Sequence, residues 1–212
     1  MRKPHLPGLL AFLFVAATAV AQVPEAKYAV PTPAVKRFEP NTMMEPITPE
    51  ARKRAMQASI GLSPFSLRDM VNLVTYKLPA RPGLSYDDVV ASLKARANKL
   101  NFKLVGVNSI YKDVEAITGK PTPRVEVFNF CDALVAREIL DHSLEFVVFF
   151  PCRIAIVEDA QGKVWLVMLD WDVSWLDDSP NPNTLPDSIR ENAQRIRRTM
   201  EEIIQAGANG EL

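Results

Sequence analysis

The sequence has few of the residues from which common catalytic and cofactor sites are built. It contains two histidines, two cysteines and eight glycines among 212 residues. The cysteines, Cys131 and Cys152, form no Cys-x-x-Cys pair, which excludes the zinc, haem and dithiol motifs that need that spacing. No glycine cluster precedes a predicted helix, so there is no phosphate-binding loop, and no Ser-His-Asp triad can be assigned. The sequence therefore does not specify a biochemical activity.

An excess of charge of one sign is also absent. The chain carries 25 basic and 25 acidic residues. Binding to a nucleic-acid backbone needs a concentrated basic face, and the clusters at 52–54 and 195–198 are short enough to be solvated helix faces. We expect no nucleic-acid partner.

The N-terminus has the pattern of a secretory signal. Arg2 and Lys3 precede an apolar segment over 9–21 that ends in Ala-Val-Ala, which predicts a signal peptide over 1–21 cleaved before Gln22. Cleavage would remove two basic residues and no acidic ones, leaving a chain with a net charge of −2. An uncleaved membrane anchor is the alternative, since a short apolar helix can span with flanking side chains reaching the interface. We expect a periplasmic or secreted protein that meets the membrane only during export.

Residues 22–62 have the composition of a tether. Four prolines lie between Gln22 and Met44, and neither helical nor strand periodicity is present, so this part should be extended. A short helix should follow, with Thr48 as its N-cap and Gly61 at its end. Its thin apolar face could dock on a partner but could not form a core.

Residues 63–207 should form a single domain with one core. The patterns predict five strands, over 69–78, 102–111, 125–130, 152–158 and 164–173. They predict three helices, over 85–100, 132–140 and from Thr184 or Asp187 to Gly207, with a loop over 112–122 that could hold a short helical turn at 114–118. The predicted fold is an α+β two-layer sandwich in the order β-α-β-β-α-β-β-α. The apolar run 146–150 before Pro151 could be a strand or a buried loop.

The stretch 125–172 organises the domain, and a hairpin is its clearest feature. Asp159 and Gly162 favour a tight turn between antiparallel strands. Alternation puts Leu166, Met168, Asp170 and Asp172 on one face of the second strand and Trp165, Val167, Leu169, Trp171 and Val173 on the other. Such a tryptophan row, continued by Trp175, usually packs under a helix, here the last one; a ligand platform or a dimer surface is the alternative.

Three short motifs in this stretch resemble the domain of unknown function 302 family. They are Asn129-Phe130-Cys131 near a helix start, Pro151-Cys152-Arg153 opening a strand, and Val-Glu-Asp-x-x-Gly-Lys over 157–163. The resemblance covers roughly 70–173. It implies a small α+β sandwich without an established activity, in a family whose exported members often lie near genes of sulfur-compound oxidation.

The two cysteines admit three interpretations. An exported chain with two cysteines favours a disulfide. If helix 132–140 is a parallel crossover, however, Cys131 and Cys152 lie at opposite ends of the sheet, beyond the roughly 7 Å between Cα atoms that a disulfide allows. Inert buried thiols are the second interpretation. The third is a ligand or redox site in which Arg153 favours a thiolate at Cys152, although neighbouring strand residues point to opposite faces.

Four weaker candidates complete the set. Thiolate, thioether and imidazole ligands would suit Cu(I), which nominates Met168 and His142 beside the cysteines, although the spacing is no metal signature. A lone His142 after a helix is more often a C-cap. Asp170 and Asp172 could bind a hard cation or act as an acid–base pair, but strand-end carboxylates are usually solvated. No cofactor or metal is assigned.

The leading hypothesis is an exported accessory or ligand-binding domain that handles a small ligand, a thiol or sulfur species, or a soft metal near Cys131 and Cys152. The second is a thiol-dependent redox or sulfur-transfer enzyme that uses Cys152. The third is a structural module that forms homodimers or binds another protein through the tryptophan face or the helix over 49–60.

Overall fold

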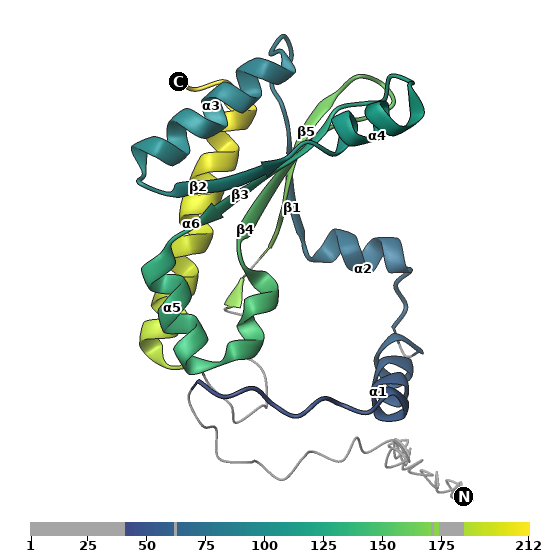
Figure 1. Ribbon diagram of the computed structural model, residues 1–212, viewed down its shortest axis with the longest axis vertical. Helices are drawn as coiled ribbons and strands as arrows, with labels where there is room; N and C mark the ends of the chain where they lie inside the picture. The colour runs from purple at the N-terminus through teal and green to yellow at the C-terminus, as the bar shows by residue number, and fades with distance from the viewer. Residues whose placement is uncertain (1–40, 62, 171, 174–184) are drawn as a thin grey trace, which may run out of the picture. The chain divides into compact units, whose positions relative to one another are not determined.

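The computed structural model describes residues 41–61, 63–170, 172–173 and 185–212 (Figure 1). Every described residue belongs to one compact unit, 37–212. The predicted signal peptide, most of the tether, Trp171 and Trp175 lie outside the described residues. Within the described part, no helix has the length and apolarity needed to cross a bilayer.

Five antiparallel strands form one sheet in the order β1-β5-β4-β3-β2. The strands are β1 (Thr75–Pro79), β2 (Lys103–Asn108), β3 (Val125–Cys131), β4 (Cys152–Glu158) and β5 (Val164–Leu169). The hairpin of β4 and β5 is as predicted, with Asp159 accepting from the backbone N–H groups of Gln161 and Lys163 and with Gly162 at φ 74°.

The sheet has a core face and a second face. Burial alternates along β3, so that Glu126, Phe128 and Phe130 are buried on the core face. Ile154, Ile156 and Leu166 continue that face and are fully buried. Two helices, α3 (Tyr86–Lys99) and α6 (Asp187–Asn209), cover it (Figure 1). The fold is therefore the predicted α+β two-layer sandwich.

Local signals explain both covering helices. Ser85 and Asp88 form the predicted reciprocal capping box of α3. Helix α6 carries the predicted apolar stripe, but Pro186 occupies the N-cap and the helix runs past Gly207 to Asn209. Gly207 is buried, and a Cβ there would lie 2.8 Å from Leu166 Cδ2. The glycine thus lets α6 approach the sheet closely.

The second face of the sheet carries the side chains that alternate along each strand with those of the core face. It includes Val127, Ala155, Val167 and Trp165, which are half-buried. The indole N–H of Trp165 donates to Asp159 Oδ2 at 2.9 Å. The prediction that the last helix covers Trp165 is wrong, because α6 packs on the opposite face, over Leu166 and Met168.

Three short helices lie where the sequence predicted a strand, a loop that could hold a helical turn, and a strand or buried loop. Ser66 and Asp69 form a capping box that starts α2 (Leu67–Leu73), so the predicted strand over 69–78 is reduced to β1. The predicted loop contains α4 (Ile110–Thr118), which ends at Gly119 in a left-handed conformation. The apolar run before Pro151 forms a 3-10 helix, η1 (Leu144–Phe149). The predicted helix that follows Thr48 is α1 (Pro49–Gly61).

The connection between β3 and β4 excludes the parallel crossover that was considered for helix 132–140. Helix α5 (Ala133–His142) packs against η1, and the chain re-enters the sheet at the end where it left. Strands β3 and β4 are therefore antiparallel, with Phe130 opposite Cys152. The helix does not cross the sheet because Val135 and Ile139 are buried against Ile189 of α6, beyond the ends of the strands.

Candidate functional site

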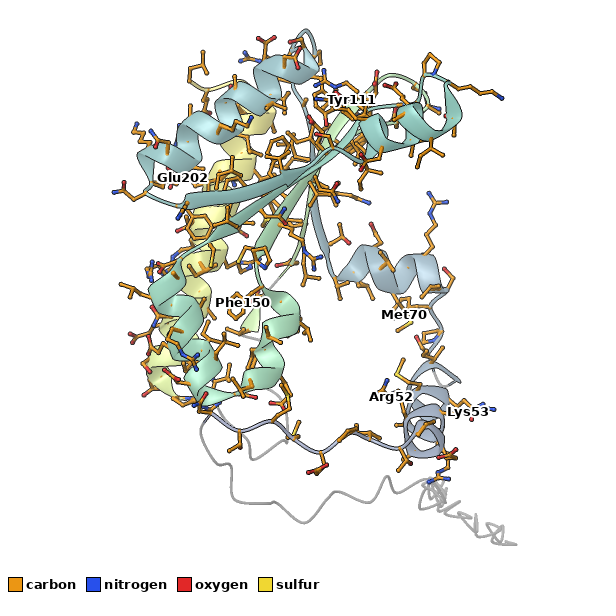
Figure 2. The ribbon with its side chains drawn as sticks, viewed as in Figure 1. Arg52, Lys53, Met70, Tyr111, Phe150 and Glu202 are labelled. Carbon is orange, nitrogen blue, oxygen red and sulfur yellow. The ribbon has the colours of Figure 1, made fainter. Side chains whose placement is uncertain are left out.

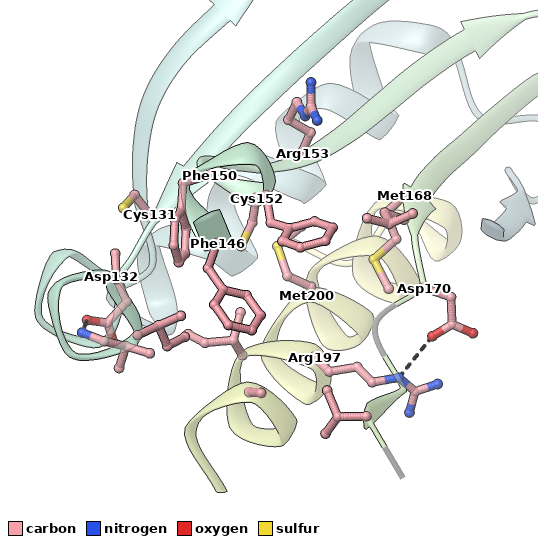
Figure 3. A pocket seen from close by; sticks show the side chains of 18 of the residues that line it. Cys131, Asp132, Phe146, Phe150, Cys152, Arg153, Met168, Asp170, Arg197 and Met200 are labelled. Atoms are coloured by element: carbon pink, nitrogen blue, oxygen red, sulfur yellow. Dashed lines mark hydrogen bonds and ion pairs between the residues drawn. The ribbon is translucent and has the colours of Figure 1, made fainter. Parts of the chain in front are cut away.

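A cavity of about 730 Å³ lies where α5, η1 and α6 meet the end of the sheet (Figure 3). Phe146, Phe149 and Phe150 line it from η1 and its C-cap. Val127, Ala155 and Val167 line it from the second face of the sheet, and Ile196 and Met200 from α6. The wall is therefore mostly apolar and draws on both faces of the sheet.

The cavity borders two clusters of apolar side chains. The main core includes Cys152, Met168 and Met200, and the smaller cluster contains Val135, Ile139 and Ile189. Ile196 packs against both clusters and also lines the cavity. Figure 2 places Phe150 at this end of the sheet and Tyr111 at the other.

Both cysteines line the cavity and both are free thiols. Antiparallel pairing brings them to the same end of the sheet, and not to the opposite ends at which a parallel crossover would place them. Because Cys152 faces Phe130, Cys131 stands one residue further along β3 and points to the second face. The two sulfur atoms point in different directions in Figure 3.

Both thiols are held in the neutral form. Burial, followed by the nearby Cys131, raises the pKa of Cys152 to about 11, and the charge of Arg153 offsets this only in part. Burial and the neighbouring Asp132 raise the pKa of Cys131, against the effect of Lys103. Cys152, which is buried, therefore lacks the electropositive, exposed setting that activates a cysteine nucleophile.

Arg153 lines the cavity from the second face, and its side chain is exposed. It stands opposite Asn129 on β3, two positions before Cys131 on the same face. Lys103 lies directly opposite Cys131 on β2 and is also exposed. The register thus places two cationic residues of the second face on either side of Cys131.

The proposed Cu(I) ligands are not brought together as a set. Cys152 and Met168 share the core face, whereas Cys131 is on the other. His142, the last residue of α5, lies outside the cavity lining, with its ring 6.4 Å from the Phe146 ring between centroids. Met200, which the sequence reasoning missed, adds a second thioether to the wall. Among the described residues, no group of three or more His, Cys, Asp or Glu could hold a metal.

The carboxylates of the wall are held by arginines. Arg197 Nε donates to Asp170 Oδ1 at 3.0 Å, and a second nitrogen of Arg197 lies 3.1 Å from Glu201 (Figure 3 shows the first). Asp172 also acts on Arg197 electrostatically, which helps to raise the pKa of the guanidinium. Asp132 caps α5 through the N–H of Val135 and pairs with Arg195 at 3.3 Å. Asp170 is therefore a salt-bridged residue rather than a solvated one.

Sequence reasoning missed the phenylalanines of η1 and Arg197. The run 146–150 was visible as apolar, but its role depends on α5 turning back at the end of the sheet. Arg197 lies in a long amphipathic helix where it resembles any solvated arginine, so the sequence holds no signal for its pairing with Asp170.

Comparisons with known proteins address the family and the fold. The family model described as "Domain of unknown function DUF302" matches residues 76–206. A crystal structure of an uncharacterized conserved DUF302 protein from Bacillus stearothermophilus is similar, with a TM-score of 0.51 at 12% identity over 63% of this chain and 98% of that one. No curated protein matches the sequence. Since the family model matches more than half of the chain, the protein belongs to the DUF302 family.

Proposed function

We propose that the protein is an exported accessory domain that binds a small, mainly apolar molecule in the cavity between the sheet, α5, η1 and α6. The carrying observation is the cavity itself. Its volume of about 730 Å³ lies within the roughly 300–1,000 Å³ of typical ligand pockets. Apolar side chains with a few polar groups among them are the usual lining of such pockets.

The sulfur atoms in the wall indicate what the ligand could be. Cys131, Cys152, Met168 and Met200 all line the cavity. Thioethers are polarizable and make favourable contacts with aromatic rings, and neutral thiols behave as small apolar groups. These residues support a binding role for an aromatic, thiol-containing or other polarizable molecule.

The thiol-enzyme alternative receives no support from the geometry. With its pKa near 11, Cys152 holds roughly one thiolate in 10,000 at pH 7. The dimer alternative stays a prediction, since Trp171 and Trp175 lie outside the described residues.

Binding can be tested with the neutral fluorescent probe N-phenyl-1-naphthylamine. Ala193 and Ala136 line the cavity from α6 and α5, so Ala193→Phe or Ala136→Phe should fill part of it. We expect saturable, one-to-one binding to the unaltered protein and at least tenfold weaker binding to either variant.

The matched control is Ala95→Phe, because Ala95 is exposed on α3 and does not line the cavity. Thermal unfolding of each variant checks that it is folded. Equal affinity of the unaltered protein and both folded cavity variants would show that the probe binds elsewhere and would contradict the proposal.

A further inference from the structure

The charged side chains around the cavity differ between its α6 side and the second face of the sheet. At the α6 end, the positive charge of Arg197 is shared by the carboxylates of Asp170 and Glu201. Near α5, Asp132 is matched by Arg195. An anion placed at the α6 end would meet more negative than positive charge.

The second face of the sheet is different. Among the described residues, the guanidinium of Arg153 has no hydrogen bond or ion pair, and neither has the ammonium of Lys103. We call these two residues the basic rim. Arg153 itself lines the cavity, and both side chains are exposed.

Cys131 lies between the members of the basic rim. Lys103 is its direct cross-strand neighbour on β2, and Arg153 is diagonal to it on β4. Lateral neighbours of this kind have Cβ atoms about 4.5–5.5 Å apart, and diagonal ones about 7–8 Å. A single anionic group above Cys131 could therefore contact both long cationic side chains.

We propose that the ligand is an amphipathic anion, whose acidic head binds the basic rim and whose apolar body enters the cavity. This rests on the proposed binding function and adds the charge and the orientation of the ligand. The body would lie against the second-face residues Val127, Ala155 and Val167 and reach the phenylalanines of η1. Arg153 is the residue that selects the charge, because it belongs to both the rim and the cavity wall.

Decanoate and decan-1-ol provide a pair of probes that share an alkyl chain but differ in the charge of the head group. We expect calorimetry to show one-to-one binding of both, with decanoate the tighter. Arg153→Gln should weaken decanoate binding roughly tenfold, the usual scale for losing a hydrogen bond to a charged group, and change decan-1-ol binding less than about twofold. Added salt should weaken decanoate binding alone.

Arg198→Gln is the matched control, since Arg198 is exposed on α6, outside the cavity lining, and its loss changes the net charge equally. It should leave both affinities unchanged. If decan-1-ol binds but decanoate binds Arg153→Gln as tightly as the unaltered protein, the cavity functions and the assignment of Arg153 is overturned. If neither probe binds the unaltered protein, both the amphipathic-anion proposal and the proposed binding function fail.

Discussion

At the scale of single residues, the two cysteines are set apart by the sheet. Each lines the same cavity, yet Cys131 is half-buried on the second face and Cys152 is buried on the core face. Cys131 follows Phe130, the residue that pairs with Cys152, and successive side chains of a strand point to opposite faces of the sheet. Their chemistry should differ accordingly.

Alkylation should distinguish the two thiols. With iodoacetamide at pH 8, we expect Cys131 to react first, because Cys152 is only 8% exposed and its raised pKa leaves about one thiolate in a thousand. Since deprotonation increases with pH, the reactivity of Cys152 should rise through pH 11. Peptide mass mapping follows both sites, and the denatured protein, in which both should react readily, is the control. Equal rates at pH 8 in the folded protein would contradict the placement of Cys152.

Of the seven residues that the sequence nominated, the structure places five in the cavity wall, namely Cys131, Cys152, Arg153, Met168 and Asp170, whereas His142 and Asp172 are not among its lining residues. Four of the five lie on strands and Asp170 directly follows β5, and alternation along a strand limits the directions its side chains can take. His142 fell outside the lining because its place depends on how α5 turns after the last strand residue. Whether any of the five contacts a ligand stays a prediction.

At the scale of elements, short-range signals predicted α3, α5 and α6, whereas α2 and the pairing of β3 with β4 were missed. Ser85 and Asp88 fixed the start of α3 because both partners of the cap lie within one turn. The same cap at Ser66 and Asp69 was overlooked in favour of a loose alternation. The direction of β4 relative to β3 depends on the packing of Val135 and Ile139 against α6, and no local pattern encodes that contact.

The contact between α6 and the sheet can be tested at Gly207. A Cβ there would lie 2.8 Å from Leu166 Cδ2 and 3.2 Å from Leu93 Cβ, and both leucines are fully buried. Gly207→Val should therefore lower the free energy of unfolding by about 1–3 kcal/mol through overpacking. Urea denaturation measures the change.

Gly61→Val is the matched control for this prediction. Gly61 ends α1 and has no atom within 4 Å of the position its Cβ would take. The substitution should change the free energy of unfolding by only about 0.5 kcal/mol. Similar losses for both variants would show that helix propensity, and not close packing, accounts for the effect at Gly207.

At the scale of the whole molecule, the domain is a sandwich whose second face remains without a covering helix layer among the described residues. The fold class was predictable because each helix and the sheet must bury an apolar face against another element. Few architectures satisfy this requirement for the observed order of strands and helices. The cavity was not predictable, because it arises where the main core and the smaller cluster at Ile189 meet. Such a space depends on the shapes of many side chains at once.

Export is a property of the whole chain and has a direct test. Expressed in a bacterium with a periplasm, the protein should be recovered from that compartment without residues 1–21, because Arg2, Lys3 and the apolar segment precede Ala19-Val20-Ala21. Intact mass spectrometry should give a chain that begins at Gln22. Replacing Ala19 and Ala21 with bulky residues is the control and should block processing. A full-length mass in the membrane fraction would indicate the uncleaved anchor instead.

The order of the strands has a consequence for how the chain folds. Strand β1 pairs with β5, so Thr75 is opposite Leu169, and the fully buried Ile203 and Ile204 come from the last helix. Neither the sheet nor its cover can be completed until nearly the whole chain is available. Contacts so distant in sequence slow folding. We therefore expect the newly made chain to stay open long enough to be threaded through a translocation channel and to acquire its native pairing only on the far side.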